Sequence, residues 1–212
     1  MKSIRLLFIF SLLVVSCRKA TINAPSVKSS LFPVQVGNYW KYKFTHRLTD
    51  STYSTTSTVA EMRILKETKL TDGRDAVIMV TTIDYNTDTI YMVNEGPDLV
   101  FYNLYPQGYT EKLRIAEPLT VGKNWSVGED TTTVLSPEPV TVPAGLFAAS
   151  KLKQVSPVPF CSCTWKKILN NTYWIKQGVG IVKQDISYYY TGFPGLPDWD
   201  QGMYELTEFH VN

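Results

Sequence analysis

The feature that most constrains this chain is the alternation of apolar and polar residues in short stretches separated by turns. Between Tyr39 and Leu48 the side chains of Trp40, Tyr42 and Phe44 alternate with polar ones, which is the period of a half-buried β-strand. No window of about a dozen residues keeps the apolar spacing of an amphipathic helix between capping residues. The composition agrees, because 23 Thr and 20 Val outnumber 8 Ala. The sequence therefore predicts an all-β fold.

Further strands are predicted at short intervals along the rest of the chain. They cover residues 55–66, 76–84, 88–94, 98–105, 111–116, 130–135, 147–155, 172–176, 180–190 and 203–211. Consecutive strands without crossover helices indicate antiparallel pairing and exclude doubly wound α/β folds with their dinucleotide sites. We expect a single antiparallel β-domain over residues 31–212, folded as a curved sheet or open half-barrel with little helix.

The N-terminal segment predicts export. Lys2 and Arg5 precede an apolar run over residues 6–15, which is too short to span a bilayer but suits a signal peptide. The sequence VVSC that ends at Cys17 resembles the lipobox of bacterial lipoproteins. That resemblance implies a signal peptide over residues 1–16, cleavage after Ser16, and acylation of Cys17 as the membrane anchor.

The charge balance and the segment after Cys17 bear on location and partners. Removing residues 1–16 takes two of the 21 Lys and Arg, so the remaining number equals the 19 Asp and Glu and no basic field remains to attract nucleic acid. Residues 17–30 are small and polar and are expected to form a lipidated tether. Arg18 follows Cys17 without an acidic run, which by resemblance to lipoprotein sorting rules implies the outer membrane, facing the periplasm.

A short motif occurs twice. The residues PVQVGNYW that end at Trp40 match PLTVGKNW, which end at Trp125, in the pattern Pro, aliphatic, any residue, Val, Gly, two residues, Trp. Each copy predicts an extended stretch, a glycine turn, and a Trp that packs the turn onto a sheet. We expect this motif to be structural.

Three segments carry a wider resemblance. The sequences LFPVQVGNYWKY from Leu31, VPAGLF from Val142 and YWIKQGVGIVK from Tyr173 resemble those of a large group of Bacteroidota-type outer-membrane lipoproteins. That group is similar to the open, curved β-barrels of LolA-like lipoprotein carriers. The resemblance implies a hydrophobic concave face, and no catalytic residues are carried over from the group.

Aromatic side chains are the candidate ligand contacts. On the strands, those expected to line the concave face are Trp40, Tyr42, Phe44, Phe101, Trp125 and Trp174. Phe193 and Trp199 lie in the aromatic loop 188–204, which is rich in Gly and Pro. This loop either covers the mouth of the barrel or packs its aromatic residues on the sheet edge.

Few residues are suited to catalysis or metal binding. His46 and His210 are the only histidines, and no Gly-x-Ser-x-Gly motif is present, so we expect no enzyme and no cofactor. Cys161 and Cys163 could form a tight disulfide, remain inert, exchange with other thiols or bind a soft metal. The segment DWDQG that begins at Asp198 lacks the ligands of a complete calcium loop, so no metal site is assigned.

Two functional hypotheses follow. The first is a non-enzymatic envelope lipoprotein that binds a hydrophobic or lipid-like ligand in the concave face of the sheet. The second is a structural module that docks on another envelope protein or on glycan through the aromatic loop 188–204. The membrane, through the acyl chains on Cys17, is a partner in both.

Overall fold

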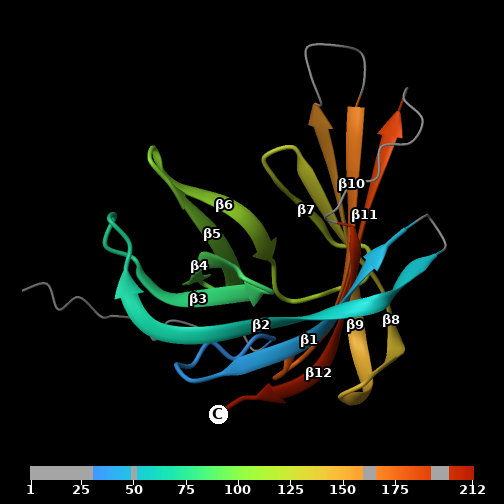
Figure 1. The fold of residues 1–212 in the computed structure, drawn as a ribbon. Coiled ribbons are helices and arrows are strands. Elements are labelled where there is room, and N and C mark those ends of the chain that lie inside the picture. Colours follow the sequence, from blue (N-terminus) through green and yellow to red (C-terminus); the bar gives the residue numbers. More distant parts are fainter. Residues whose placement is uncertain (1–30, 49–51, 160–165, 192–200) are drawn as a thin grey trace, which may run out of the picture.

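The computed structural model describes residues 31–48, 52–159, 166–191 and 201–212, and these residues form one continuous sheet (Figure 1). The twelve strands are β1 (Tyr39–Arg47), β2 (Tyr53–Lys69), β3 (Asp75–Ile83), β4 (Asn86–Glu95), β5 (Asp98–Tyr105), β6 (Gly108–Ile115), β7 (Asn124–Val127), β8 (Asp130–Val142), β9 (Gly145–Pro159), β10 (Lys166–Lys176), β11 (Gly180–Thr191) and β12 (Gly202–His210). No helix occurs in the described residues. The predicted all-β fold is therefore confirmed.

The strands are antiparallel throughout, and their order in the sheet is β6-β5-β4-β3-β2-β1-β12-β11-β10-β9-β8-β7. Each strand pairs with the next one along the chain, except that β6 does not pair with β7. Instead, β1 pairs with β12, and β6 and β7 are the two end strands of the sheet. Because directions alternate, every odd-numbered strand ends at one edge of the sheet, here called the upper edge, and begins at the lower edge. The segment 31–38 and the last residues, 211–212, both adjoin the lower edge.

The alternation in β1 is realised as predicted. Trp40, Tyr42 and Phe44 are buried with at most 4% of their surface exposed, whereas Lys41 and Lys43 lie on the other face. The side chains of a strand alternate between faces, so the apolar set of β1 turns together toward the interior. The same alternation places Ala60, Ile64 and Met79 of β2 and β3 in the core.

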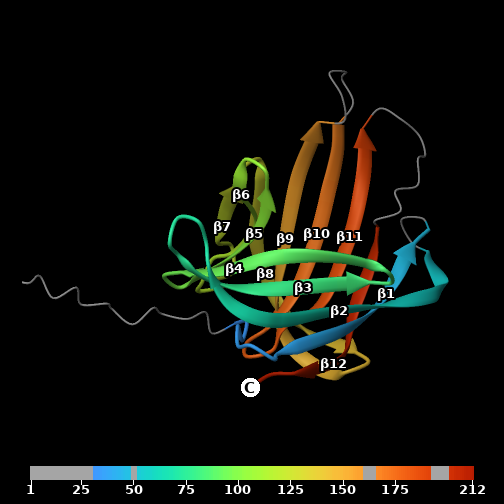
Figure 2. The same ribbon diagram turned by 60° about the vertical axis from the view of Figure 1, so that its left-hand side comes forward.

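The sheet bends until its two ends approach each other. Figures 1 and 2 show β2 and β3 running across β10 and β11, with the interior between them. At the junction of β6 and β7 the indole N–H of Trp125 donates to the backbone carbonyl of Arg114 at 3.0 Å. The Lys123 ammonium group donates to the carbonyls of Ala116 and Glu117 in the connecting loop. Side chains, rather than a full strand ladder, thus draw the end strands together.

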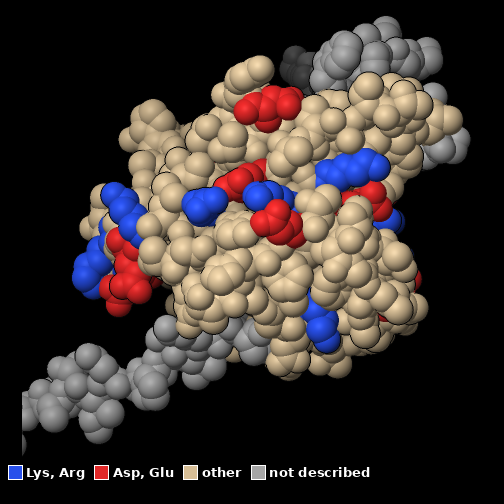
Figure 3. All heavy atoms as spheres, turned by 60° about the horizontal axis from the view of Figure 1, so that its bottom comes forward, with Lys and Arg blue, Asp and Glu red and all other residues tan. Residues whose placement is uncertain are grey.

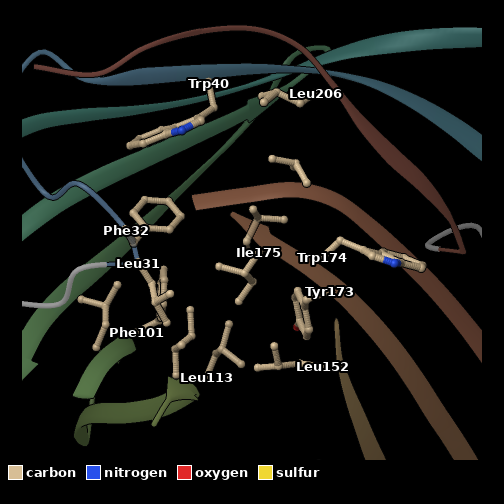
Figure 4. Close-up of a cluster of buried hydrophobic side chains, with 14 of the residues drawn as sticks. Leu31, Phe32, Trp40, Phe101, Leu113, Leu152, Tyr173, Trp174, Ile175 and Leu206 are labelled. Carbon is tan, nitrogen blue, oxygen red and sulfur yellow. The ribbon is translucent and has the colours of Figure 1, made fainter. Parts of the chain in front are cut away.

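The segment 31–38 closes the interior at the lower edge. Leu31 and Phe32 are buried, and Phe32 packs 4.6 Å from the ring of Trp40 and 6.0 Å from that of Phe101, measured between centroids (Figure 4). Asn38 is fully buried; its amide donates to the carbonyl of Pro33, and its side-chain oxygen accepts from the backbone N–H of Asn212. This segment is therefore part of the core.

The repeated motif has the same geometry in both copies. The N–H of Gly37 donates to Ile64, and the N–H of Ile64 donates back to Asn38; Gly122, Val134 and Lys123 repeat this exchange. Both glycines have a positive φ, +94° for Gly37 and +84° for Gly122, which favours a residue without a side chain. The expectation that the motif is structural is confirmed.

β7 and β8 show where the observed strands depart from the predicted ones. β7 was not predicted, because four residues are too few to establish an alternation. β8 continues to Val142 although Pro137 and Pro139 suggested an end at Leu135. Since β7 pairs only with residues 130–133, one side of β8 beyond them has no neighbouring strand, and proline is tolerated on such an edge.

The outer surface has mixed charge. Figure 3, which views the molecule from below, shows acidic and basic side chains next to one another. Ion pairs such as Lys41 with Glu208 (2.9 Å) and Arg63 with Glu61 (2.8 Å) join side chains of opposite charge. In the described part of the chain, no helix is long and apolar enough to cross a membrane.

Candidate ligand-binding cavity

A cavity of about 500 Å³ lies inside the curved sheet. Its apolar lining comes from the segment 31–38 and from β2–β6 and β10–β12: Phe32, Met62, Met79, Ile83, Ile90, Phe101, Leu113, Leu169, Tyr173, Ile181, Ile186 and Tyr204. Phe32 forms the floor on the side of the lower edge. The cavity opens to solvent near the upper edge, where it is lined by three exposed residues at the start of β4: Asn86, Thr87 and Asp88.

The two walls of the cavity differ in polarity. On the β2–β6 wall Met62, Met79 and Phe101 present apolar atoms around the Thr81 hydroxyl, which is buried without a hydrogen-bond partner among the described residues. On the β8–β11 wall, polar side chains occupy inward positions even though they are nearly inaccessible: Gln154 is 4% exposed and Asn171 8%. The interior is therefore amphipathic.

The polar side chains of the β8–β11 wall form one chain of hydrogen bonds. The amide of Gln184 donates to the Asn171 oxygen (2.9 Å), and the amide of Asn171 donates to the Tyr173 hydroxyl (2.7 Å). That hydroxyl donates to Oε1 of Gln154 (3.0 Å), whose Nε2 donates to Oδ2 of Asp130 (2.9 Å). We call these five residues, drawn from β8, β9, β10 and β11, the polar ladder. Buried polar groups cost free energy unless they are paired, and the ladder pairs them with one another.

Sequence reasoning missed the polar ladder. Gln154 lies opposite Asn171 and Tyr173 lies opposite Gln184 in the strand registers, so they share the inner face. The spacing of Asn171 and Tyr173 two residues apart was a signal that they share a face. Which face turns inward was not available from the sequence, because β9 and β10 mix polar and apolar residues on both sides.

Three of the predicted ligand contacts fill the packed part of the interior instead of lining the cavity. The indole N–H of Trp40 donates to the carbonyl of Val179 at 2.6 Å, and the Tyr42 hydroxyl donates to that of Ile181 at 2.8 Å. Burial raises the pKa of Tyr42, so this hydroxyl remains a donor. The ring of Phe44 stacks on Tyr204 at 4.4 Å. These residues hold β1 and its partner strands against the β10–β11 hairpin and β12.

The other described candidates take three different positions. Phe101 lines the cavity. Trp125 joins β7 to β6, as described above. Trp174 follows the cavity-lining Tyr173 and lies opposite Lys151 and Lys183, with their ammonium nitrogens 5.2 Å and 5.5 Å from the ring centroid. Trp174 therefore lies on the face of β10 opposite Tyr173, where it is still buried, with 9% of its surface exposed, and its indole N–H donates to Glu138.

The remaining candidates lie outside the described residues. They are Cys17 with the rest of residues 1–30, Cys161 and Cys163, and Phe193 and Trp199 of the aromatic loop. The proposed anchor, the disulfide alternatives and the docking role of the loop thus stay predictions. Among the described residues, no group of three or more His, Cys, Asp or Glu side chains is arranged to hold a metal ion.

A second polar cluster lies on the outer face of β4–β6, and its members satisfy one another. Glu95 accepts hydrogen bonds from the Tyr102 hydroxyl (2.6 Å), from Arg114 (2.8 Å) and from Arg74. Burial acts to raise the pKa of Glu95, but the hydrogen bonds from Tyr102 and Arg114 outweigh it and lower the pKa. The cluster covers a small apolar group that includes Val93 and Val100, which indicates a structural role.

Comparisons with known proteins place the fold. No model of a known protein family matches the chain, and no curated protein matches it. Two solved structures are similar: a protein inferred to be exported, with a YmcC-like fold, from Bacteroides fragilis (TM-score 0.55), and a protein inferred to be a lipoprotein from Parabacteroides distasonis (TM-score 0.52). Each is 14% identical, and each match covers 86% of this chain and 99% of the other. The chain shares their fold, and identity this low supports no statement beyond the fold.

Proposed function

We propose that this protein is a lipid-anchored envelope protein that binds a hydrophobic or lipid-like ligand in the cavity and acts by binding, not by catalysis. The observation that carries the proposal is the unfilled space of about 500 Å³ above Phe32, in an interior that is otherwise closely packed. Pockets for small ligands commonly measure about 300–1,000 Å³ and are mostly apolar. A carrier role of the kind implied by the resemblance to lipoprotein carriers agrees with this geometry.

The positions of the histidines support a binding role. His210 lies at the lower edge, is exposed, and stacks on Tyr39 at 5.9 Å. His46 packs against Phe44 at 4.6 Å. Neither lines the cavity, so neither is placed to act as an acid or base on a ligand bound there.

The segment 31–38 determines where the proposed anchor would join the barrel. The chain reaches Leu31 at the lower edge, whereas the cavity meets solvent near the upper edge. The fourteen residues from Cys17 to Ser30 span at most about 50 Å when extended. An acylated Cys17 would therefore hold Leu31 within about 50 Å of the membrane. We place the protein at the outer membrane, facing the periplasm.

The binding proposal is tested with the chain from residue 18 on, which retains every described strand and every contact that closes the barrel. Circular dichroism and cooperative urea unfolding first verify the fold. Titration with the apolar fluorophore N-phenyl-1-naphthylamine is expected to give saturable fluorescence with one site per chain. Thr81→Phe, on the cavity side of β3, is expected to weaken this binding at least about tenfold by filling the space.

Val80→Phe is the matched control, because Val80 is the neighbour of Thr81 on the opposite face of β3. It adds an aromatic ring to the same strand without entering the cavity. Equal affinity in Thr81→Phe and the wild type, or no saturable binding at all, would count against the cavity as a binding site.

The anchor is tested separately in whole cells. The wild type is expected in the membrane fraction with a mass that includes acyl chains on Cys17, whereas Cys17→Ser is expected in the soluble fraction. An intact, unmodified amino terminus on the purified native protein would refute the anchor while leaving the binding test unaffected.

A further inference from the structure

We propose that the cavity selects uncharged amphiphiles, with an apolar chain against the β2–β6 wall and a head group that donates a hydrogen bond to Oε1 of Gln184. This inference rests on the proposed binding function and specifies the ligand class. It follows from the direction of the polar ladder, from the apolar surface opposite, and from the charges at the mouth.

The ladder has a fixed direction. The Asp130 carboxylate can only accept, so it orients the Gln154 amide with its nitrogen toward Asp130 and its oxygen toward Tyr173. The Tyr173 hydroxyl donates its proton to Gln154, so toward Asn171 it acts as an acceptor. The side-chain oxygen of Asn171 in turn accepts a hydrogen bond from Gln184. Every donor points toward Asp130, and the far end of the ladder is a carbonyl acceptor, Oε1 of Gln184.

That acceptor is unused and accessible. Oε1 of Gln184 accepts no hydrogen bond from any described residue, and Gln184 is half-buried on the cavity wall. A ligand hydroxyl or amide N–H that donates to this oxygen would extend the polar ladder by one hydrogen bond. Aligned hydrogen bonds polarise one another, which strengthens the bond at the end of the chain. An ether or ester oxygen in the same place has no O–H or N–H to donate to Oε1 of Gln184.

The apolar part of the ligand has a matching surface. Met62, Met79 and Phe101 face the ladder from the opposite wall, with Phe32 below them. Methionine side chains adapt their shape to different apolar groups, which suits a flexible alkyl chain. An amphiphile can thus satisfy both walls at once, whereas a purely apolar ligand would leave the Gln184 oxygen without water or a partner.

The charges near the mouth disfavour an ionised head group. Asp88, Lys112 and Asp130 border the cavity, and the Lys112 ammonium group lies 3.8 Å from the Asp88 carboxylate. The two carboxylates outnumber the one ammonium group at the mouth, so an incoming anion meets a net negative charge, and Asp130 repels it from the ladder side. A cationic head group would lose its hydration on entering the cavity, and a trimethylammonium group has no N–H to donate to Oε1 of Gln184.

The test compares ligands that share a ten-carbon chain. 1-Decanol, decanoate, decyltrimethylammonium and decyl methyl ether are each titrated below their aggregation limits, at pH 7.5, as competitors of the fluorophore with the chain from residue 18 on. 1-Decanol is expected to bind at least about tenfold more tightly than either ion, and about three- to tenfold more tightly than the ether. Tighter binding of decanoate or of the ammonium compound than of the alcohol would overturn the proposal.

A variant isolates the acceptor. Gln184→Met keeps the length of the side chain but removes the donor to Asn171 as well as the acceptor, so Asn171→Leu is added to take away the oxygen that would be left unpaired. In Gln184→Met/Asn171→Leu the advantage of 1-decanol over the ether is expected to vanish. Gln177→Met, at an exposed position in the β10–β11 turn, is the control and is expected to retain the advantage. If the advantage persists in the double variant, the head group does not donate to Gln184.

The outcomes also separate this inference from the binding function. Fluorophore binding that is lost in Thr81→Phe, together with equal affinity for all four head groups, would refute the selectivity and leave the cavity as a binding site. Absence of fluorophore binding to the wild type would refute the binding function itself.

Discussion

Gly180, the first residue of β11, is the position at which a single added carbon tests the packing of the cavity floor. A Cβ built on Gly180 would lie 2.7 Å from both Cδ2 and Cε2 of Phe32, whereas carbon atoms in contact are normally about 3.5–4.0 Å apart. Phe32 is fully buried against Trp40, so its ring can retreat only toward the cavity. Gly180→Ala should therefore destabilise the fold and reduce the space for a ligand.

The expected size of the effect has two parts. The φ of Gly180 is +98°, and an L-residue in such a conformation costs about 1 kcal/mol or more. Overpacking of a close-packed core costs about 1–3 kcal/mol further. We expect Gly180→Ala to lower the free energy of unfolding by about 2–4 kcal/mol, measured by urea denaturation with an unchanged m-value.

Gly178, in the same turn, is a matched control. Its φ is also positive, +74°, but no heavy atom lies within 4 Å of the Cβ it would carry, so Gly178→Ala should cost only the backbone part, about 1 kcal/mol. In a Phe32→Ala background the cost of Gly180→Ala should fall toward that same value, because the obstructing ring is gone. Equal costs at the two glycines, or a cost at Gly180 that is unaffected by Phe32→Ala, would refute this account of the floor.

Three further predictions concern groups that hold the barrel together. The pKa of Glu95 is lower in the folded protein than its ordinary value of 4.5, so the ionised carboxylate stabilises the fold above pH 4.5, and this stabilisation is lost as the pH falls through the lowered pKa. Glu95→Gln should therefore make the free energy of unfolding, measured with urea, decline less steeply below pH 4.5. Trp125→Phe removes the donor to Arg114 and should cost about 1 kcal/mol, with faster hydrogen exchange in β6 than in β1. Asn38→Ala removes the hydrogen bonds that the buried Asn38 side chain makes to Pro33 and Asn212, and it should cost about 1–3 kcal/mol in the same urea assay; an effect below about 0.5 kcal/mol, the size of a neutral surface change, would contradict its structural role.

The fold class was predictable because it depends on local patterns that the sequence displays directly. The alternation in β1 has large aromatic side chains on one face and lysines on the other, so its strand character does not depend on its neighbours. The prediction was weakest where pairing decides the structure. β10 begins at Lys166, six residues before the predicted start at Thr172, because β9 and β11 both pair with this segment.

The candidate site was less predictable, because a large aromatic residue on the inner face either fills space or borders it. Trp40 and Phe101 are both buried and inward-facing, yet only Phe101 meets the cavity. The difference arises from the segment 31–38, which folds back so that Phe32 fills the space beside Trp40. The contact between Phe32 and Trp40 depends on how the chain folds back in three dimensions, so no periodic pattern in the sequence predicts it.

The unfilled space itself has a physical explanation in the division of the interior. Toward the lower edge, Phe32, Trp40 and Tyr42 meet across the barrel, and their bulk together with hydrogen bonds to Val179 and Ile181 fixes the separation of the two walls. Toward the upper edge the β8–β11 wall carries amides that pair with one another along the wall and do not reach across. The packed half therefore provides the stability that allows the other half to remain hollow, and cavity-filling substitutions near the upper edge should reduce binding without unfolding the protein.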